Sequence, residues 1–478
     1  MRKQMNFYKK TICIILLGML CLMSACGENK ENGGSIFGQK QGKQQDLPED
    51  APWNHGAAAI METETGWYTG GTMMGTGMCL RYYDKASGNT ILLCNKPECQ
   101  HEWNDECVAT YRNIRIINAL LYDGFLYVYG AEGNLQSGAP TSSKTVSLCI
   151  WRAAPDGSVI DKVGTVIEAE NTQDQVVNSP SGLFTGHSQD QCFIIHQGYA
   201  YIPYYLQFGT GMIGFQGGGL MKMELATGKT EEVVTMEYPI EGVPCYLSAF
   251  GDTLYYYQPP KNGGKVFPLY RYSISEKTIQ ELTLWSGDVD MAFGGKKHAF
   301  LSSSVATFTK DRVYTLGHAF EEEEDGTLSI LAFDGMTGEL IKEECLDLDL
   351  PYSEKARRRS ARAPYYLSLM PSPDGLFLAD DKVAYFYDLS GKKLGEIEVP
   401  REMLGIKEHD NYLYLVYKIC NEKLYLIYEC QDDCGYSRVL SCPIEEIYQG
   451  VGAYQDAYRI QGYMTYEKYM EVMQQYAQ

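Results

Sequence analysis

The sequence predicts an all-β protein, and three observations support this fold class. Tyrosine and glycine are abundant, with 38 and 48 residues, which favours strands and tight turns over helical bundles. Apolar runs are short and are broken by turn residues. A similar unit recurs along most of the chain, as in folds whose neighbouring units bury each other's apolar faces. Because 45% of the residues are hydrophobic, wholesale disorder is excluded.

The composition is acidic. The chain carries 61 acidic and 41 basic residues, which gives a formal net charge of −20. A protein of this charge repels nucleic acid and anionic lipid at long range. We therefore expect no nucleic-acid partner.

The first 25 residues are expected to form a signal peptide. Residues 1–10 carry four basic side chains and no acidic one, and residues 11–23 form an apolar stretch that is shorter than a spanning helix of about 20 residues. Ser24 and Ala25 then precede Cys26. This order resembles a bacterial lipoprotein signal, except that Met23 stands where leucine is usual. The resemblance implies a lipidated Cys26 that anchors the protein at the outer face of the bacterial cytoplasmic membrane. An ordinary secretory peptide or an uncleaved anchor is the alternative.

The rest of the chain divides into three parts. Residues 26–51 are mostly Glu, Asn, Gly, Lys and Gln, which predicts a flexible tether. Residues 52–463 contain the repeats. Residues 464–478 have Tyr, Met and Val at helical spacing, which predicts a terminal helix.

Each repeat begins with a polar turn and a Tyr-rich alternating strand. Copies of this first half occur at residues 122–127, 196–201, 251–256, 310–314, 373–377 and 409–414. A second turn follows each of them, as in Asp156-Gly157 or Thr227-Gly228, where glycine supplies a positive φ. An earlier second turn at residues 84–88 brings the number of units to seven. The units are about 58 residues long, which is enough for four strands and their loops.

These units predict a β-propeller. Isolated hairpins are not stable in water, whereas radial stacking of four-stranded sheets buries both faces of each sheet. We therefore predict about seven blades, with six or eight as alternatives. A β-sandwich array is the competing fold, but no linker separates the units. One arrangement of the closing blade combines strands from residues 55–70 with the C-terminus.

Three features together resemble a known group of proteins. They are the strands of the type Leu254-Tyr255-Tyr256-Tyr257, the lipoprotein-like Cys26, and the segment of residues 94–101 that contains Cys94 and Cys99. The chain is similar, over most of its length after the signal, to the propeller-like lipoproteins of anaerobic Gram-positive bacteria, which form a domain-of-unknown-function family. The resemblance implies a propeller at the cell surface and brings no known activity.

Two groups of cysteines are candidate sites. Three thiols and an imidazole lie within 14 residues and could hold zinc, although their spacing matches no common zinc motif and an exported chain favours disulfides. Disulfides, a zinc site and free thiols all remain open for this first group, which comprises Cys94, Cys99, His101 and Cys107. In the last repeat, a disulfide is predicted between Cys430 and Cys434, with buried apolar thiols as the alternative for this repeat's cysteines.

Two glycine loops begin with the same four residues, Gly75-Thr76-Gly77-Met78 and Gly209-Thr210-Gly211-Met212. We predict equivalent loops on one rim, which either contact a ligand or simply connect strands. Residues 209–214 also match a dinucleotide-binding fingerprint. The glycine-rich residues 215–219 cannot open the helix that would hold a pyrophosphate, so the match is judged false.

A basic run stands out in this acidic chain. It contains Arg357, Arg358, Arg359 and Arg362 and is a candidate docking site for anionic lipid, teichoic acid or an acidic partner, or a protease-sensitive loop. An acidic run at residues 321–325 lacks the alternating pattern of a calcium loop, which predicts a solvated hairpin tip.

Three functions are compatible with these features. The leading hypothesis is a noncatalytic, lipid-anchored module that binds a glycan, peptide or protein at the cell surface. The first alternative is an envelope scaffold for a membrane protein complex. The second is a propeller glycosidase or lyase, which needs carboxylates from several blades to meet. The sequence contains no Gly-x-Ser-x-Gly elbow and no HExxH motif, so catalysis is not encoded locally.

Overall fold

The computed structural model divides the chain into two compact units, Met1–Gln45 and Asp46–Gln478, and all described residues belong to the second. The described residues are 60–69, 80–99, 109, 114–132, 145–170, 175–178, 193–208, 215–237, 245–257, 268–283, 291–293, 296–300, 306–320, 325–353, 367–380, 382–405, 415–429 and 436–461. The predicted signal peptide, Cys26, the tether and the terminal helix lie outside these ranges. None of the described helices is long and apolar enough to span a bilayer.

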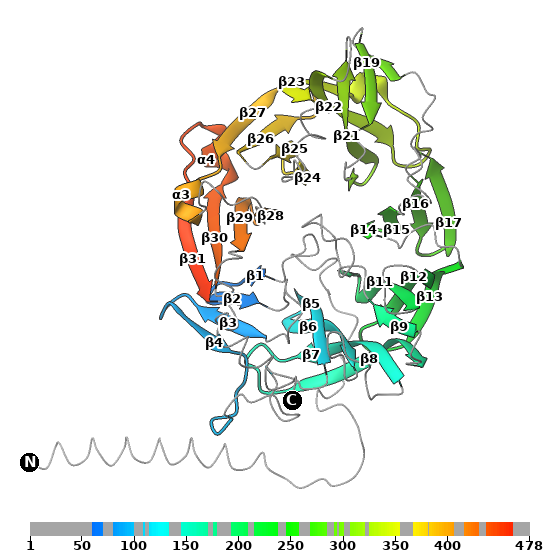
Figure 1. The fold of residues 1–478 in the computed structure, drawn as a ribbon, viewed down its shortest axis with the longest axis vertical. Helices are drawn as coiled ribbons and strands as arrows, with labels where there is room; N and C mark the ends of the chain where they lie inside the picture. Colours follow the sequence, from blue (N-terminus) through cyan, green and yellow to red (C-terminus); the bar gives the residue numbers. More distant parts are fainter. Residues whose placement is uncertain are drawn as a thin grey trace, which may run out of the picture. The chain divides into compact units, whose positions relative to one another are not determined.

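Seven antiparallel sheets follow one another along this unit and form a seven-bladed β-propeller (Figure 1). The predicted fold class and blade number are confirmed. We number the blades 1 to 7 in chain order. The first strands of successive blades contact one another around the axis, as β5, β10 and β14 do. The fourth strands lie at the outer edge (Figure 1).

Blades 1 to 4 contain the following strands. Blade 1 has β1 (Ile60–Glu62), β2 (Gly66–Thr69), β3 (Arg81–Asp84) and β4 (Asn89–Leu92). Blade 2 has β5 (Ile114–Tyr122), β6 (Phe125–Glu132), β7 (Thr145–Ala153) and β8 (Ile160–Glu170). Blade 3 has β10 (Ile194–His196), β11 (Tyr199–Phe208), β12 (Phe215–Glu224) and β13 (Thr230–Glu237), with β9 (Gln175–Asn178) paired to β11. Blade 4 has β14 (Cys245–Phe250), β15 (Thr253–Tyr257), β16 (Pro268–Ser273) and β17 (Thr278–Thr283).

Blades 5 to 7 complete the propeller. Blade 5 has β20 (Thr307–Phe308), β21 (Arg312–Phe320), β22 (Asp325–Asp334) and β23 (Leu346–Ser353). A hairpin of β18 (Met291–Phe293) and β19 (Lys296–Phe300) extends this sheet, and a short 3-10 helix, η3 (Lys342–Glu344), lies between β22 and β23. Blade 6 has β24 (Ser368–Ser372), β25 (Gly375–Ala379), β26 (Val383–Asp388) and β27 (Lys393–Glu398), and is followed by the helix α3 (Arg401–Leu404). Blade 7 has β28 (Leu415–Cys420), β29 (Lys423–Glu429), β30 (Tyr436–Pro443) and β31 (Gln455–Gln461), with the helix α4 (Ile444–Tyr448) before β31.

The closing blade does not combine the two ends of the chain. All described strands of blade 1 come from residues 60–92, and all those of blade 7 come from residues 415–461. The arrangement that pairs strands from residues 55–70 with the C-terminus is therefore wrong. Instead, side chains of blades 7 and 1 meet in one apolar cluster that includes Trp67 and Tyr425.

The two ends of the blades differ. At one end, here called the turn end, turns of two or three residues join the first strand to the second, and the connections from the third strand to the fourth lie at the same end, with longer ones at residues 335–345 and 444–454. Asp123-Gly124 has φ values of 46° and 75°, and Asn421-Glu422 has 50° and 60°. These positive φ values are those of the two-residue hairpin turn expected from the sequence. At the other end, here called the loop end, connections join the second strand to the third and each blade to the next; they range from the three residues 380–382 to long segments such as residues 133–144 and 354–367.

The last repeat has a different register from the one expected. The first hairpin turn of blade 7 is Asn421-Glu422, whereas residues 409–414, read as the sixth copy of the turn and strand, lie outside the described residues before β28. The segment that contains Cys430 and Cys434 connects the second strand to the third. The connection from the third strand to the fourth contains α4.

Glycines in the turns between third and fourth strands set the spacing between blades. A Cβ on Gly228, in blade 3, would lie 1.9 Å from the carbonyl oxygen of Val163 in the outer strand of blade 2. A Cβ on Gly391, in blade 6, would lie 3.2 Å from Leu346 in blade 5. Each of these turns packs on the outer strand of the preceding blade, and at Gly228 only glycine fits so close an approach.

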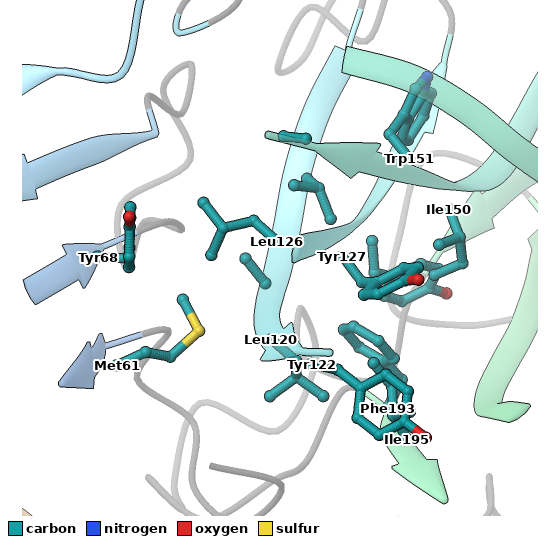
Figure 2. Packing of buried hydrophobic residues seen from close by; sticks show 14 of the residues in the cluster. Met61, Tyr68, Leu120, Tyr122, Leu126, Tyr127, Ile150, Trp151, Phe193 and Ile195 are labelled. Carbon is teal, nitrogen blue, oxygen red and sulfur yellow. The ribbon is translucent and has the colours of Figure 1, made fainter. Parts of the chain in front are cut away.

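One tyrosine position repeats around the propeller. The third residue of the second strand is tyrosine in six blades and phenylalanine in blade 6: Tyr68, Tyr127, Tyr201, Tyr255, Tyr314, Phe377 and Tyr425. Tyr68 donates a hydrogen bond to the Pro155 carbonyl of blade 2, and Tyr255 donates to the Gly335 carbonyl of blade 5, both at 3.0 Å. Figure 2 shows the same packing at blades 1 to 3, where Met61 and Tyr68 lie toward blade 2. Tyrosines at this position therefore join blade 1 to blade 2 and blade 4 to blade 5.

Aspartates hold many of the second turns. The Asp388 carboxylate accepts hydrogen bonds from Ser390 and from the Lys392 amide, and the Asp334 carboxylate accepts them from the Met336 and Thr337 amides. These bonds, above all those from serine hydroxyls and turn amides, lower the pKa of five aspartates below its usual value: Asp84, Asp156, Asp252, Asp334 and Asp388.

We predict that acid weakens the propeller through these turns. A carboxyl group whose pKa is lower in the folded state stabilises it above the unfolded pKa of about 4, and this contribution is lost as pH falls through the folded value. Asp388→Ala should lower the melting temperature at neutral pH, and its difference from wild type should shrink below about pH 4. Glu398→Ala, at an exposed position on β27, is the matched control for differential scanning calorimetry. A difference that stays constant with pH would contradict the prediction.

Candidate functional site

Five titratable residues meet where blade 7 packs on blade 1. We call them the closing cluster: Glu62, Lys85, Lys418, Cys420 and Tyr425. Glu62 ends the innermost strand of blade 1, and Lys418 and Cys420 lie on the innermost strand of blade 7. Sequence reasoning did not identify any of the five as a functional group of this kind.

Strand alternation turns Lys418 toward blade 1. Leu415 and Tyr417 belong to the apolar cluster shared with blade 6, whereas Val416 belongs to the cluster shared with blade 1. Lys418 and Cys420 lie on the same face as Val416, because alternate residues of a strand share a face. Only 3% of Lys418 is exposed. The strand thus holds a lysine inside the closing interface.

Tyr425 joins the blades through a carboxylate. It stands opposite Lys418 in the β28–β29 pair, and its hydroxyl donates to Glu62. Lys85 pairs with the same carboxylate at 2.9 Å and also donates to the Thr63 carbonyl. At the comparable joints, Tyr68 and Tyr255 donate to neutral backbone carbonyls. The closing interface therefore replaces a carbonyl acceptor with a charged one, which forms a stronger hydrogen bond.

Aromatic rings surround this ion pair. Trp67 meets Tyr425 edge-on, with ring centroids 5.7 Å apart, and lies 5.3 Å from Tyr458 of β31. The Lys85 ammonium lies 5.8 Å from the ring centroids of both Trp67 and Tyr458. Cation–π attraction and the ion pair together hold the Lys85 ammonium in place, so blade 1 contributes a fixed cation to the interface.

Burial shifts the proton equilibria of this cluster. Desolvation lowers the pKa of Lys418 to about 8, and the nearby Cys420 raises it only in part. Desolvation and the Glu62 hydrogen bond raise the pKa of Tyr425. Desolvation also raises the pKa of Cys420. An amine with a pKa near 8 is partly neutral at physiological pH, and buried groups with such shifts are candidates for function.

The predicted cysteine site is only partly described. Cys94 has a free thiol and follows β4, where its amide donates to the Leu92 carbonyl at 2.8 Å. Cys99 is half-buried in a turn, and its backbone amide donates to the Lys96 carbonyl. His101 and Cys107 lie outside the described residues. Within the described ranges no group of three or more His, Cys, Asp or Glu residues could hold a metal ion. The choice between zinc, disulfides and free thiols stays a prediction.

Other cysteines are placed by the fold. Cys345 and Cys442 have free thiols, and burial raises the pKa of each to about 11. Cys442 pairs with Leu424 and Cys420 with Lys423, so Cys420 and Cys442 lie on opposite faces of blade 7. Cys442 is thus a buried thiol. Cys430 and Cys434 lie outside the described residues.

The remaining predicted segments share one end of the blades. The loop of residues 75–78 connects β2 to β3, and that of residues 209–212 connects β11 to β12. Both connections therefore join a second strand to a third, and their equivalence on one rim stays a prediction. Residues 357–362 connect blade 5 to blade 6 at the same loop end. All these residues lie outside the described part. The residues after the glycine loop form strand β12, which agrees with rejecting the dinucleotide match.

The innermost strands bear on the glycosidase alternative, which needs paired carboxylates. Among the described innermost strands, β1, β5, β10, β14, β20, β24 and β28, Glu62 is the single carboxylate. It is already engaged by Tyr425 and Lys85. These strands supply no second carboxylate within the described residues.

Comparisons with known proteins concern the fold. No family model and no curated protein matches the chain. Among solved structures, a prolyl endopeptidase is 12% identical over 85% of this chain and 50% of its own, with a TM-score of 0.44. A puromycin hydrolase is 11% identical over 88% and 56%, with a TM-score of 0.44. The β-propeller domain of the Trilobed protease from Pyrococcus furiosus, which has an open velcro topology, is 10% identical over 69% and 81%, with a TM-score of 0.36. The chain spans about half the length of the first two proteins.

Breaking the closing hydrogen bond should destabilise the protein more than breaking its counterpart elsewhere. Tyr425→Phe should lower the free energy of unfolding by about 1.5–3 kcal/mol, since the lost bond involves a carboxylate. Tyr255→Phe, the matched control at the joint of blades 4 and 5, should lower it by about 0.5–1.5 kcal/mol. Urea denaturation measures both. Equal losses would show that the charged acceptor is unimportant.

Replacing the buried lysine should stabilise the protein. Because its folded pKa of about 8 is below the unfolded value of 10.5, the charged form of Lys418 disfavours folding at neutral pH. Lys418→Met should raise the free energy of unfolding by roughly 3 kcal/mol below pH 8. The gain should shrink as pH rises from about 8 to 10.5, where the folded wild type sheds this proton first.

Chemical denaturation across this pH range measures the Lys418→Met effect. Lys382→Met, at an exposed position beside β26, is the control and should change little at any pH. A destabilised Lys418→Met variant would mean that the lysine contributes more through its contacts than it loses by desolvation.

Proposed function

We propose that the protein is a noncatalytic binding module that is anchored by lipid at Cys26 and presents its loop end to a glycan, peptide or protein at the cell surface. The observation that carries this proposal is the difference between the two ends of the blades. The turns between first and second strands at the turn end have two or three residues, as in residues 123–124 and 421–422. Connections at the loop end include residues 133–144, 258–267 and 354–367.

The turn end is occupied by contacts between blades. Gly228 lies against Val163, Tyr68 against Pro155, and the Lys277 ammonium pairs with Glu231 across blades 3 and 4. A side chain that fixes the spacing of blades is not available to a ligand. Loops on a rigid scaffold are where binding residues concentrate, because their sequence can vary without loss of the core.

Burial excludes several tyrosines from the residues that could contact a ligand. Tyr129, Tyr201, Tyr255, Tyr256 and Tyr425 are all at most 1% exposed. These rings cannot stack on a sugar or a peptide. Recognition would then depend on the loop-end connections, and the strong acidity of the chain favours a neutral or basic ligand.

A ligand screen tests the proposal. The chain from Gly27 to Gln478 is mixed with peptidoglycan fragments, other glycans and peptides, and its melting temperature is measured. A ligand at 100 times its dissociation constant adds about 2.7 kcal/mol to the free energy of unfolding. Replacing residues 133–144 or 258–267 by a short turn should abolish the shift.

Exposed turn-end variants are the matched controls. Met336 and Leu389 are 52% and 54% exposed in turns between third and fourth strands. Met336→Ser and Leu389→Ser should leave the ligand shift unchanged. The proposal is overturned if these variants lose the ligand-induced rise in melting temperature while the shortened-loop variants keep it, because the ligand would then bind at the turn end. If no ligand shifts the protein, crosslinking in intact cells tests the scaffold alternative, and turnover of any glycan hit tests the enzyme alternative.

A further inference from the structure

We propose that the interface between blades 3 and 4 binds a small monovalent anion, such as chloride or a carboxylate group, between the ammonium of Lys222 and the hydroxyl of Tyr201. The site is separate from the loop end and from the closing cluster. It rests on two buried donors that no described residue satisfies.

A row of side chains crosses blade 3 at this place. Register pairs Ile194 with Tyr201, Tyr201 with Lys222, and Lys222 with Glu231. Ile194 and Tyr201 share an apolar cluster with Tyr272 of blade 4, so the row faces blade 4. Tyr201 is fully buried and Lys222 is 8% exposed. Both polar groups are therefore enclosed between two blades.

Neither donor has a hydrogen-bond acceptor among the described residues. The Tyr201 hydroxyl is buried without a partner. The Lys222 ammonium lies 4.1 Å from the ring centroid of Tyr199 and 5.9 Å from that of Tyr201. A ring face attracts a cation but accepts no hydrogen bond of ordinary strength. Burial accordingly lowers the pKa of Lys222.

The carboxylates nearby are already engaged. Glu231 pairs with Lys277 of blade 4. Asp252 accepts from the hydroxyls of Ser273 and Ser275, and Glu224 accepts from Thr227. They raise the pKa of Lys222 from a distance, but none of them comes within ion-pair distance of its ammonium in the described structure. Among the described residues, the interface thus has two buried donors and no acceptor within hydrogen-bond distance of them.

An anion is the group that these donors fit. Water would satisfy the tyrosine hydroxyl and leave the lysine charge uncompensated, and an uncompensated buried charge is unfavourable. A small anion accepts from both donors and compensates the charge. The space is limited because Tyr256 and Leu254 of blade 4 are also fully buried here. The exposed Glu231–Lys277 pair at the outer end of the row marks the side that faces solvent.

The neighbouring blades show the alternative solution. At the same register position, blade 2 has Arg152 opposite Tyr127, and blade 4 has Arg271 opposite Tyr255. Burial raises the pKa of Tyr127 and Tyr255, and the arginine beside each of them lowers it in part. These two blades place a forked guanidinium beside the tyrosine, whereas the lysine of blade 3 lies over the ring of Tyr199. Of these three tyrosines, Tyr201 is the one whose hydroxyl is buried without a hydrogen-bond partner in the described structure.

Anion-dependent melting of the full chain tests the site. Chloride or formate is titrated at constant ionic strength, with gluconate as the bulky balancing anion. The wild type should gain stability with the small anion, by about 1.4 kcal/mol for each tenfold rise above the dissociation constant. Lys222→Met removes the charge, and Lys222→Arg rebuilds the pair of blades 2 and 4. Both should lose the response, while Lys229→Met, at an exposed position in the same hairpin, should keep it.

Two measurements determine the source of the anion and its position. A response to both chloride and formate indicates a free-ion site, and a response to formate alone indicates a site for the carboxylate of a larger molecule; either supports the proposal. Anomalous scattering from crystals grown in bromide should then place a peak beside Lys222. The proposal is overturned if no anion stabilises the wild type, if Lys222→Met responds as the wild type does, or if bromide binds elsewhere only.

Discussion

Each blade of this propeller is a sheet with two apolar faces, and neither face is satisfied until both neighbouring blades are in place. The first blade and the last must therefore meet, although no described strand is shared between them. In this protein that meeting depends on a charged hydrogen bond, from Tyr425 to Glu62, inside an aromatic cluster. At two other joints the equivalent tyrosines, Tyr68 and Tyr255, donate to neutral backbone carbonyls instead.

The closing cluster combines stabilising and destabilising groups. Glu62 and Lys85 compensate each other and are further held by Trp67 and Tyr458. Lys418 is buried in the same interface, and desolvation of its charged amine opposes folding. A methionine of similar size would avoid this loss. The innermost strand of blade 7 therefore carries a lysine that is buried in the joint with blade 1.

The repeat could be predicted because its signals are local. Asp123-Gly124 and Thr227-Gly228 mark turns, and tyrosine recurs at one position of the second strand, so the number of blades follows from counting. The last blade was misread because residues 412–414 match the tyrosine pattern as well as Tyr425 does. The closing contact could not be predicted at all, since Glu62 and Tyr425 are 363 residues apart in sequence.

The candidate site was missed for a related reason. In a sheet with one face in water, a lysine between Tyr417 and Ile419 would point to solvent. In a propeller, both faces of a strand are covered, so alternation does not separate the core from the surface. The same holds for Lys222, which sequence alone gives no reason to distinguish from Arg152 or Arg271. Only the contacts between blades reveal which of these cations has a partner.

The absence of a strand shared between the first and last blades, within the described residues, affects how such a chain can change in evolution. Because each described sheet is built from one continuous segment, a blade can be duplicated or deleted as a single stretch of sequence without breaking a sheet. The position at which the chain opens is equally unconstrained by hydrogen bonding between strands. Only the side chains at the new junction would need to adapt, as Glu62 does here by taking the place of the backbone acceptors of Tyr68 and Tyr255.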